Sequence, residues 1–200
     1  MSPENSLKKY RDKRNFSKTG EPAGRKKKSG KKPVFVIQKH AASRLHYDLR
    51  LEIDGVLVSW AVPKGPSTDP GEKRLAVRTE DHPLEYAGFE GIIPEDEYGG
   101  GTVLLWDSGT YRNLKEEGDK KLSMSEALAN GHLTVWLQGK KLQGGFALTR
   151  VKYRSENDWL LVKMKDEKAD AAHNPLNIRP ESVKSGRTIE EIAGRKGNND

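Results

Sequence analysis

The sequence contains no cysteine among its 200 residues. This absence excludes disulfide bonds, thiolate metal ligands and cysteine nucleophiles, and it is typical of proteins of the cytosol. Any bound metal must therefore be held by histidine, carboxylate or water. The sequence also lacks a run of about 18 apolar residues, and no apolar segment follows its charged N-terminus. We therefore expect neither a membrane span nor a secretory signal, and we predict a cytoplasmic protein.

Charge is divided unevenly along the sequence. The net charge is +7, yet residues 1–33 hold 12 lysines and arginines against 3 acidic residues, and the remainder holds 24 against 26. The basic character therefore belongs to an N-terminal arm, whereas the body is close to neutral. A basic arm suits a polyanion such as DNA or RNA, because each neutralised phosphate releases condensed counterions. Charge alone is equally compatible with a solubilising tail.

The body of the sequence has the pattern of short strands. Residues 46–53 alternate strictly between apolar and polar side chains, which is the period of a strand with one buried face. Asp54-Gly55 then predicts a two-residue hairpin turn, with residues 56–62 as the returning strand. Further strands are predicted at residues 34–37, 74–79, 102–106, 132–137, 145–152 and 159–164.

Helical signals are few. Residues 123–129 predict a helix that ends at Asn130-Gly131 with a left-handed cap. Thr188 and Glu191 have capping-box spacing and predict a short terminal helix, and residues 7–11 predict a helical turn. Many short strands with so few helices favour a mainly β protein: a compact, closed or nearly closed antiparallel β-barrel with one or two short helices.

The composition divides the chain into three segments. Residues 1–33 form the basic arm and are predicted to be partly disordered, because residues 25–33 are a low-complexity basic run. Residues 34–168 are predicted to form the barrel. Residues 169–200 are predicted to be a C-terminal tail with a short helix.

One segment combines residue types that bind metals and phosphates. On the alternating strand, His46, Asp48 and Arg50 share a face at spacings of about 6.6–7 Å. His40 ends the preceding strand, and a short loop folds it back beside His46. Two imidazoles and one carboxylate form a site with open positions, which manganese, zinc, iron and cobalt all accept. Arg50 is placed to hold a phosphate oxygen; the alternative is that this histidine and aspartate mark a solvated strand edge.

Other histidines and a glycine run carry weaker signals. His82 precedes Pro83, which favours extended backbone at a strand end. Its imidazole is suited to contact a phosphate oxygen or to protonate a leaving alkoxide, unless it is a loop histidine without a role. Glycines 99–101 lack the Lys-Ser/Thr of a P-loop and predict a turn or a close approach of backbones. We interpret His132 and His173 as structural or surface residues.

Several stretches together closely resemble the 3′-phosphoesterase domain of bacterial ATP-dependent DNA ligase D. The stretches are residues 35–40 (FVIQKH), 44–50 (RLHYDLR), 59–65 (SWAVPKG), 80–83 (EDHP) and 91–101 (GIIPEDEYGGG). The resemblance extends from residue 7 to about residue 165. It implies a compact β-barrel and a manganese-dependent enzyme that acts on the 3′ end of a primer strand. Such enzymes remove a terminal ribonucleoside by phosphodiester cleavage and then the 3′-phosphate, which leaves a 3′-hydroxyl for ligation.

The resemblance also implies roles for individual residues. By motif position, it implies a metal site held by His40, His46 and Asp48. It implies contacts with the scissile phosphate from His82, Arg50 and Arg74. It assigns further catalytic or substrate-binding positions to Lys64, Tyr86, Arg14 and Glu21. Because the last two belong to the basic arm, part of the arm is expected to fold back over the active site.

The sequence departs from the family pattern in two respects. Asn15 stands where the family usually has aspartate, so a hydrogen bond is retained there but a charge is lost. The chain is also too short for the polymerase and ligase domains of the fused enzymes. We therefore expect a stand-alone version in the prokaryotic cytoplasm, associated with the nucleoid and acting beside separately encoded ligase, polymerase and end-binding proteins. Two alternatives stay open: a non-catalytic nucleic-acid-binding barrel, and a 3′-phosphomonoesterase without the ribonuclease step.

Overall fold

The alternating segment forms a strand in the computed structural model of the chain, which describes residues 6–24, 30, 32–117, 120–152 and 155–194. Strand β2 (Leu45–Ile53) buries its apolar face in the main hydrophobic core. Asp54 and Gly55 both have positive φ angles, +49° and +82°, as a type I′ turn requires. The predicted hairpin from β2 to β3 (Val56–Val62) is therefore confirmed.

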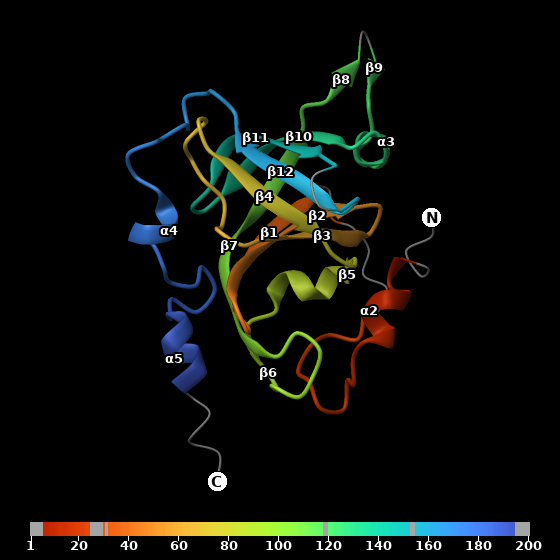
Figure 1. Cartoon of the computed structure of the whole chain (residues 1–200), viewed down its shortest axis with the longest axis vertical. Helices are drawn as coiled ribbons and strands as arrows, with labels where there is room; N and C mark the ends of the chain where they lie inside the picture. The colour runs from red at the N-terminus through yellow and green to blue at the C-terminus, as the bar shows by residue number, and fades with distance from the viewer. Residues whose placement is uncertain (1–5, 25–29, 31, 118–119, 153–154, 195–200) are drawn as a thin grey trace.

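Eight strands of the described chain close a barrel (Figure 1). In spatial order they are β1 (Val34–Ala41), β2, β3, β4 (Lys73–Arg78), β12 (Asp158–Lys163), β11 (Gln143–Arg150), β10 (His132–Gly139) and β7 (Gly101–Asn113). The pairing of β7 with β1 closes the ring, and each of these pairs is antiparallel. The predicted mainly β barrel is therefore confirmed.

Four further short strands in the described part of the chain lie outside the ring. Strand β5 (His82–Pro83) pairs with β3, and β6 (Gly91–Ile93) pairs with β7. Strands β8 (Glu116–Glu117) and β9 (Lys120–Lys121) form a separate hairpin. Strand β5 carries His82, and β6 precedes the loop with Tyr98; both side chains lie near the polar face of β2.

Strand β7 is longer than the sequence predicted. The pattern predicted residues 102–106, but the strand continues to Asn113 through the polar sequence Asp107-Ser108-Gly109. The buried Asp107 carboxylate accepts hydrogen bonds from the backbone amides of Ser108, Lys140, Lys141 and Leu142. These bonds support the strand where its register with β1 shifts. The polar residues therefore gave no strand pattern in the sequence, although pairing with β1 and β10 continues β7 through them.

The barrel interior holds the main core. Trp60, Trp106, Phe35 and Phe146 are among the largest side chains that are fully buried. The Trp60 ring meets that of Trp159 edge to face at a centroid distance of 5.6 Å. Burial of side chains of this kind contributes roughly 1.5–3 kcal/mol each, so the interior stabilises the scaffold on which the polar face is displayed.

The arm is attached to the outside of the barrel by a second apolar cluster. Helix α2 (Lys8–Asp12) contributes Tyr10, and the 3-10 helix η1 (Leu84–Gly88) contributes Leu84 and Tyr86. Leu57 of β3 completes the cluster. The segment that follows α2 is thereby held beside η1 and the loop that follows β6 (Figure 1).

The predicted helix ends have the expected caps. Helix α3 (Met124–Ala129) begins with a capping box between Ser123 and Glu126, and Gly131 beyond its end has a φ of +75°. Helix α5 (Ile189–Ala193) begins with the predicted capping box between Thr188 and Glu191. Both predictions are confirmed.

The C-terminal segment is packed on the barrel as far as the structure describes it. Helix α4 (Pro175–Ile178) precedes Arg179, whose carbonyl accepts bonds from Trp106 Nε1 at 2.9 Å and Lys141 Nζ at 2.7 Å. Burial lowers the pKa of Lys141 to about 8. Ile189 and Ile192 of α5 lie in the main core and pack beside β6 and β7.

Two sequence expectations concern other parts of the chain. The predicted disordered run at residues 25–33 lies for the most part outside the described residues. Within the described ranges, none of the helices has the length and apolar character needed to cross a membrane.

Candidate metal and phosphate site

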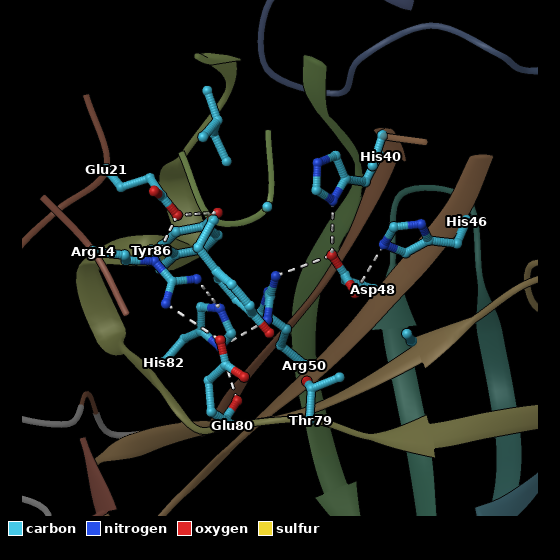
Figure 2. Close-up of a pocket in the computed structure, with 15 residues that line it drawn as sticks. Arg14, Glu21, His40, His46, Asp48, Arg50, Thr79, Glu80, His82 and Tyr86 are labelled. Carbon is cyan, nitrogen blue, oxygen red and sulfur yellow. Dashed lines mark hydrogen bonds and ion pairs between the residues drawn. The ribbon is translucent and has the colours of Figure 1, made fainter. Parts of the chain in front are cut away.

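A pocket of about 200 Å³ opens between the arm and the polar face of β2 (Figure 2). Its charged and polar walls come from the arm, β1, β2, the segment around β5, and η1. The lining residues are Arg14, Glu21, His40, Ala42, His46, Asp48, Arg50, Ala61, Thr79, Glu80, His82, Tyr86, Ile93, Tyr98 and Gly99.

One end of the pocket gathers three potential metal ligands. His40 of β1 lies directly opposite His46 of β2 in the antiparallel register, and their ring centroids are 4.8 Å apart. Asp48 is two residues further along β2, on the same face. One ligand atom from each residue lies within 4.8 Å of the others. His40 Nδ1 and His46 Nε2 are each 3.8 Å from an oxygen of Asp48.

This donor set fits a divalent transition metal. Ligands at about 2.0–2.2 Å from one ion lie roughly 3–4 Å from one another, close to the separations observed. His46 Nδ1 donates to the Arg44 carbonyl at 2.9 Å, which leaves the Nε2 lone pair facing Asp48. Burial lowers the pKa of His40, so its imidazole is neutral at neutral pH and has a lone pair for a metal. His40 Nε2 is buried without a hydrogen-bond partner.

Arg50 lies beside this set and links it to the rest of the pocket. Its guanidinium donates to Gln38 Oε1 at 2.7 Å, Ser59 Oγ at 2.9 Å and Asp48 Oδ2 at 3.1 Å. Only 3% of the residue is exposed. The carbon at the centre of the guanidinium also lies 4.8 Å from the Tyr86 ring centroid. These contacts fix the orientation of the arginine before any ligand binds.

His82 lies between two arginines. Its Nδ1 is 2.9 Å from Arg50 Nη1 and 3.0 Å from the Glu80 carbonyl, and its Nε2 is 3.4 Å from Arg14 Nη2. Burial, together with the charges of Arg50 and Arg14, lowers the pKa of His82 well below its ordinary value. An arginine can only donate and the Glu80 carbonyl can only accept, so the two contacts at Nδ1 call for opposite tautomers of the imidazole. With the proton on Nδ1, His82 donates to Glu80 and its Nε2 accepts from Arg14.

The arm supplies the opposite wall. Arg14 Nε donates to Glu21 Oε1 at 2.9 Å, and Arg14 Nη1 donates to Glu80 Oε1 at 3.2 Å. The Tyr86 hydroxyl donates to the same Glu21 oxygen at 3.1 Å, and burial raises the pKa of Tyr86 well above its ordinary value. Arg14 and Glu21 are thus fixed in the pocket although they precede the first barrel strand (Figure 2).

The charge of the lining depends on a cation. The pocket contains two guanidinium groups and three carboxylates, so its formal charge is −1 when the histidines are neutral. A divalent ion beside Asp48 changes this charge to +1. The site therefore attracts a phosphate more strongly when a metal is bound.

The structure brings together eight of the ten residues that the sequence singled out. Arg14, Glu21, His40, His46, Asp48, Arg50, His82 and Tyr86 all line the pocket. Lys64 and Arg74 do not. Lys64 follows β3, and Arg74 of β4 donates to Glu72 on the same stretch of chain. Their roles stay predictions.

Positions with weaker sequence signals are also placed. The Asn15 side chain accepts from the amide and hydroxyl of Ser17, so it forms a local turn and does not line the pocket. His132 contacts Thr149 and Thr134, and His173 is exposed. The predicted close approach of backbones in the glycine run is confirmed, because a Cβ on Gly101 would lie 2.3 Å from the Ala41 carbonyl.

Sequence reasoning missed several polar or aromatic groups at the site, among them Gln38, Glu80 and Tyr98. Each belongs to a stretch that carried the family resemblance, and this was the only signal for them. Glu80 accepts from Arg14 at 3.2 Å and from Lys13 at 3.1 Å. Although burial opposes it, the Lys13 contact helps to lower the pKa of Glu80.

The chain matches known proteins over this same region. Residues 38–150 match the family described as the DNA ligase D 3′-phosphoesterase domain. The chain belongs to this family. The matched residues carry the predicted metal ligands, Arg50 and His82, whereas Arg14 and Glu21 lie outside them.

Several curated bacterial proteins are similar over most of the chain. The "multifunctional non-homologous end joining protein LigD" of Pseudomonas aeruginosa is 47% identical over 194 residues, which are 94% of this chain and 22% of that protein. The protein of the same description from Mycolicibacterium smegmatis is 47% identical over 173 residues, 86% of this chain and 21% of its own length. A Mycobacterium tuberculosis relative is 45% identical over 87% of this chain. The chain thus spans about a fifth of the length of these relatives.

Proposed function

We propose that the chain is a manganese-dependent phosphoesterase that heals the 3′ ends of primer-template DNA or RNA-tipped DNA during repair. It removes a 3′-terminal ribonucleoside and then the remaining 3′-phosphate. The observation that carries this proposal is the juxtaposition of His40, His46 and Asp48 with the Arg50–His82–Arg14 row in one pocket. Membership in the phosphoesterase family supports the reaction class.

The residues of the pocket divide into two groups by chemistry. His40, His46 and Asp48 would hold the ion, which when bound polarises a phosphoryl oxygen and supplies an acidified water. Arg50 and Arg14 hold the non-bridging oxygens and neutralise the charge that builds on them. His82 lies between the two arginines, where its imidazole contacts a phosphoryl oxygen or passes a proton to the leaving oxygen.

Hydrolysis of either bond requires the same contacts. A water oxygen bonds to phosphorus, the bond from phosphorus to the leaving oxygen breaks, and a proton passes to that oxygen. In the diester the leaving oxygen is the 5′-oxygen of the terminal ribonucleoside. In the monoester it is the 3′-oxygen of the primer, so one pocket serves both steps in sequence.

The deciding experiment uses a labelled primer-template that ends in a 3′-phosphate and a second that ends in a ribonucleoside. Purified protein is incubated with each in manganese, with magnesium and chelator as parallel conditions. We expect metal-dependent conversion of both to a 3′-hydroxyl. We also expect loss of both reactions in His40→Ala, His46→Ala and Asp48→Ala, with folding checked by thermal melting.

Other outcomes would select an alternative. Full activity in any one of the three variants would contradict the ligand assignment. DNA binding without turnover under any divalent ion would favour a non-catalytic barrel. Release of phosphate without removal of the ribonucleoside would favour a phosphomonoesterase, the outcome that the missing carboxylate at Asn15 makes worth testing. Partner proteins, such as a separate ligase and polymerase, are a proposal from the multifunctional relatives.

A further inference from the structure

An exposed aromatic side chain stands at the mouth of the pocket. Tyr98 lies in the loop between β6 and β7, lines the pocket and is 48% exposed. The other tyrosine in the lining, Tyr86, is 2% exposed and packed among aromatic side chains. Tyr98 is therefore the lining tyrosine whose ring a ligand can reach.

The pocket is too small to enclose a nucleoside together with its phosphate, so the nucleoside must lie at the mouth. Its volume of about 200 Å³ is below the roughly 300–1,000 Å³ that is typical for drug-sized ligands. Its lining carries two arginines, three carboxylates and three histidines beside a few small or apolar residues, and these charged groups suit an ion and a phosphoryl group. When a phosphate lies between Arg50 and Arg14, the nucleoside attached to it must extend toward the rim.

Neighbouring groups hold the Tyr98 ring in place. Lys13 Nζ donates to its hydroxyl at 3.0 Å and lies 4.4 Å from the ring centroid, and the Arg14 guanidinium is 5.5 Å from the centroid. The loop itself is braced by two backbone turns, from Glu97 to Pro94 and from Gly100 to Glu97. Both cations lie over the ring, which is 48% exposed, so a flat surface is held in place next to positive charge, and bases stack on such surfaces beside a phosphate.

We propose that Tyr98 is the stacking surface of a nucleoside subsite, on which the base of the 3′-terminal ribonucleoside lies while its phosphate occupies the pocket. This inference rests on the proposed function and adds to it a binding site for the leaving nucleoside. A substrate that ends in a 3′-phosphate has no base beyond the scissile phosphate. Tyr98 therefore contributes more to removal of the ribonucleoside than to removal of the phosphate.

A spectroscopic test observes stacking without turnover. The probe is a primer-template whose 3′-terminal residue is 2-aminopurine riboside, linked by a phosphonate in which a methylene group replaces the scissile oxygen. Its fluorescence falls when the base stacks. We expect wild-type protein, Tyr98→Phe and the distant exposed-surface control Ile178→Ala to lower the fluorescence, and Tyr98→Ala to leave it unchanged. A second dye at the far end reports by anisotropy that every variant still binds the duplex.

A kinetic test compares single-turnover cleavage of a base-bearing and an abasic 3′-terminal residue. We expect the wild type to prefer the base-bearing end by about tenfold, equivalent to about 1.4 kcal/mol and within the range of about 1–3 kcal/mol for stacking of one base. Tyr98→Ala should lose this preference, whereas Tyr98→Phe should retain it. Removal of a 3′-phosphate should fall less in Tyr98→Ala than removal of the base-bearing ribonucleoside, because the 3′-phosphate substrate has no base to stack.

The outcomes separate this inference from the proposed function. If wild-type protein cleaves neither substrate, the proposed function fails, and the fluorescence test still decides whether a base stacks on Tyr98. Unchanged quenching in Tyr98→Ala, or an equal loss of both hydrolytic steps, overturns the subsite. The latter result would indicate that Tyr98 acts only by holding Lys13 and the arm.

Discussion

Arg50 illustrates how a single side chain can decide the geometry of the whole site. Its guanidinium contacts groups from β1, β2, β3 and β5 at once, and it is almost fully buried. Lysine supplies the same charge but not the planar fork that reaches several acceptors together. We therefore expect two separable roles for Arg50: to balance the charge of Asp48, and to orient the donors that would contact a phosphate.

Substitution of Arg50 tests these two roles. Arg50→Met leaves Asp48 buried without its cation, and we expect the metal-free protein to lose about 3–5 kcal/mol of unfolding free energy. Arg50→Lys should be closer to wild type in stability, but its rate of phosphate release should fall roughly 10²–10³-fold, as when one oriented donor is removed. Urea unfolding with chelator and a phosphate-release assay measure the two effects. Arg112→Lys is the control, because Arg112 is exposed and lies over the Trp136 ring. It should change neither the unfolding free energy nor the rate of phosphate release.

At the scale of the element, helix α2 and its following loop act as one wall of the pocket. Tyr10 is fully buried, its ring lies 5.0 Å from that of His82, and the Arg14 guanidinium stacks 3.9 Å from its centroid. The Tyr10 hydroxyl donates to the Pro22 carbonyl at 2.7 Å, which folds the loop back on the helix. Tyr10 is therefore one of the groups that position Arg14, as an aromatic anchor beside the ion pairs of Arg14 with Glu21 and Glu80.

Removal of this anchor should free the arm without unfolding the barrel. We expect Tyr10→Ala to increase hydrogen exchange across residues 8–24 while the barrel strands stay protected, because the cluster around Tyr10 is separate from the main core. Cleavage should weaken with the loss of Arg14 from its position. Tyr10→Phe should cost only about 0.5–1.5 kcal/mol for its hydrogen bond. Lys9→Ala, exposed on the same helix, should leave exchange unchanged; an equal effect there would contradict the anchor.

For helix α5 we expect the opposite result: a change in its buried face should lower the stability of the whole protein. Ile192 is 4% exposed and lies in the main core, so Ile192→Ala should lower global stability by about 2–5 kcal/mol. Ile178→Ala in α4, where the side chain is 61% exposed, is the matched control. Thermal or urea unfolding measures both. A neutral Ile192→Ala would show that residues 169–200 behave as a separable tail.

At the scale of the molecule, the site joins segments that are distant in the sequence because the barrel closes. The strand alternation and the hairpin turn were predictable, since both are set by neighbours within a few residues. The cross-strand pair of His40 and His46 followed from a short loop between two strands. Glu80 and Tyr98 could not be placed in this way, because β5 pairing and the β6–β7 loop bring them to the pocket. Lys64 and Arg74 share the family pattern, yet the fold directs them elsewhere.

Protonation should couple the pocket to overall stability. His82 and His40 are buried, and burial lowers both pKa values from the ordinary value of about 6.5. Below about pH 6.5 the unfolded chain therefore binds protons that the folded chain does not. We expect the unfolding free energy of metal-free protein to fall from pH 7 to pH 5, by at most about 1.4 kcal/mol per pH unit for each histidine. Urea unfolding at each pH, with chelator present, measures the slope.

Two variants serve as a check on this slope. His82→Asn should flatten the dependence, because the buried neutral imidazole is gone. His173→Asn, a change at an exposed histidine, should leave it intact. A slope that survives in His82→Asn and in His40→Asn alike would assign the acid sensitivity to other groups.

The antiparallel register of β1 and β2 also has a consequence for the order of folding. His40, His46 and Asp48 occupy one hairpin, whereas barrel closure must pair Val34 with Thr110, 76 positions apart. Local pairs form early and distant ones late, so we expect these three side chains to come together before the ring is complete. A metal ion present during refolding would stabilise the correct hairpin register at that early stage. We therefore expect manganese to speed refolding of the wild type and not of Asp48→Ala.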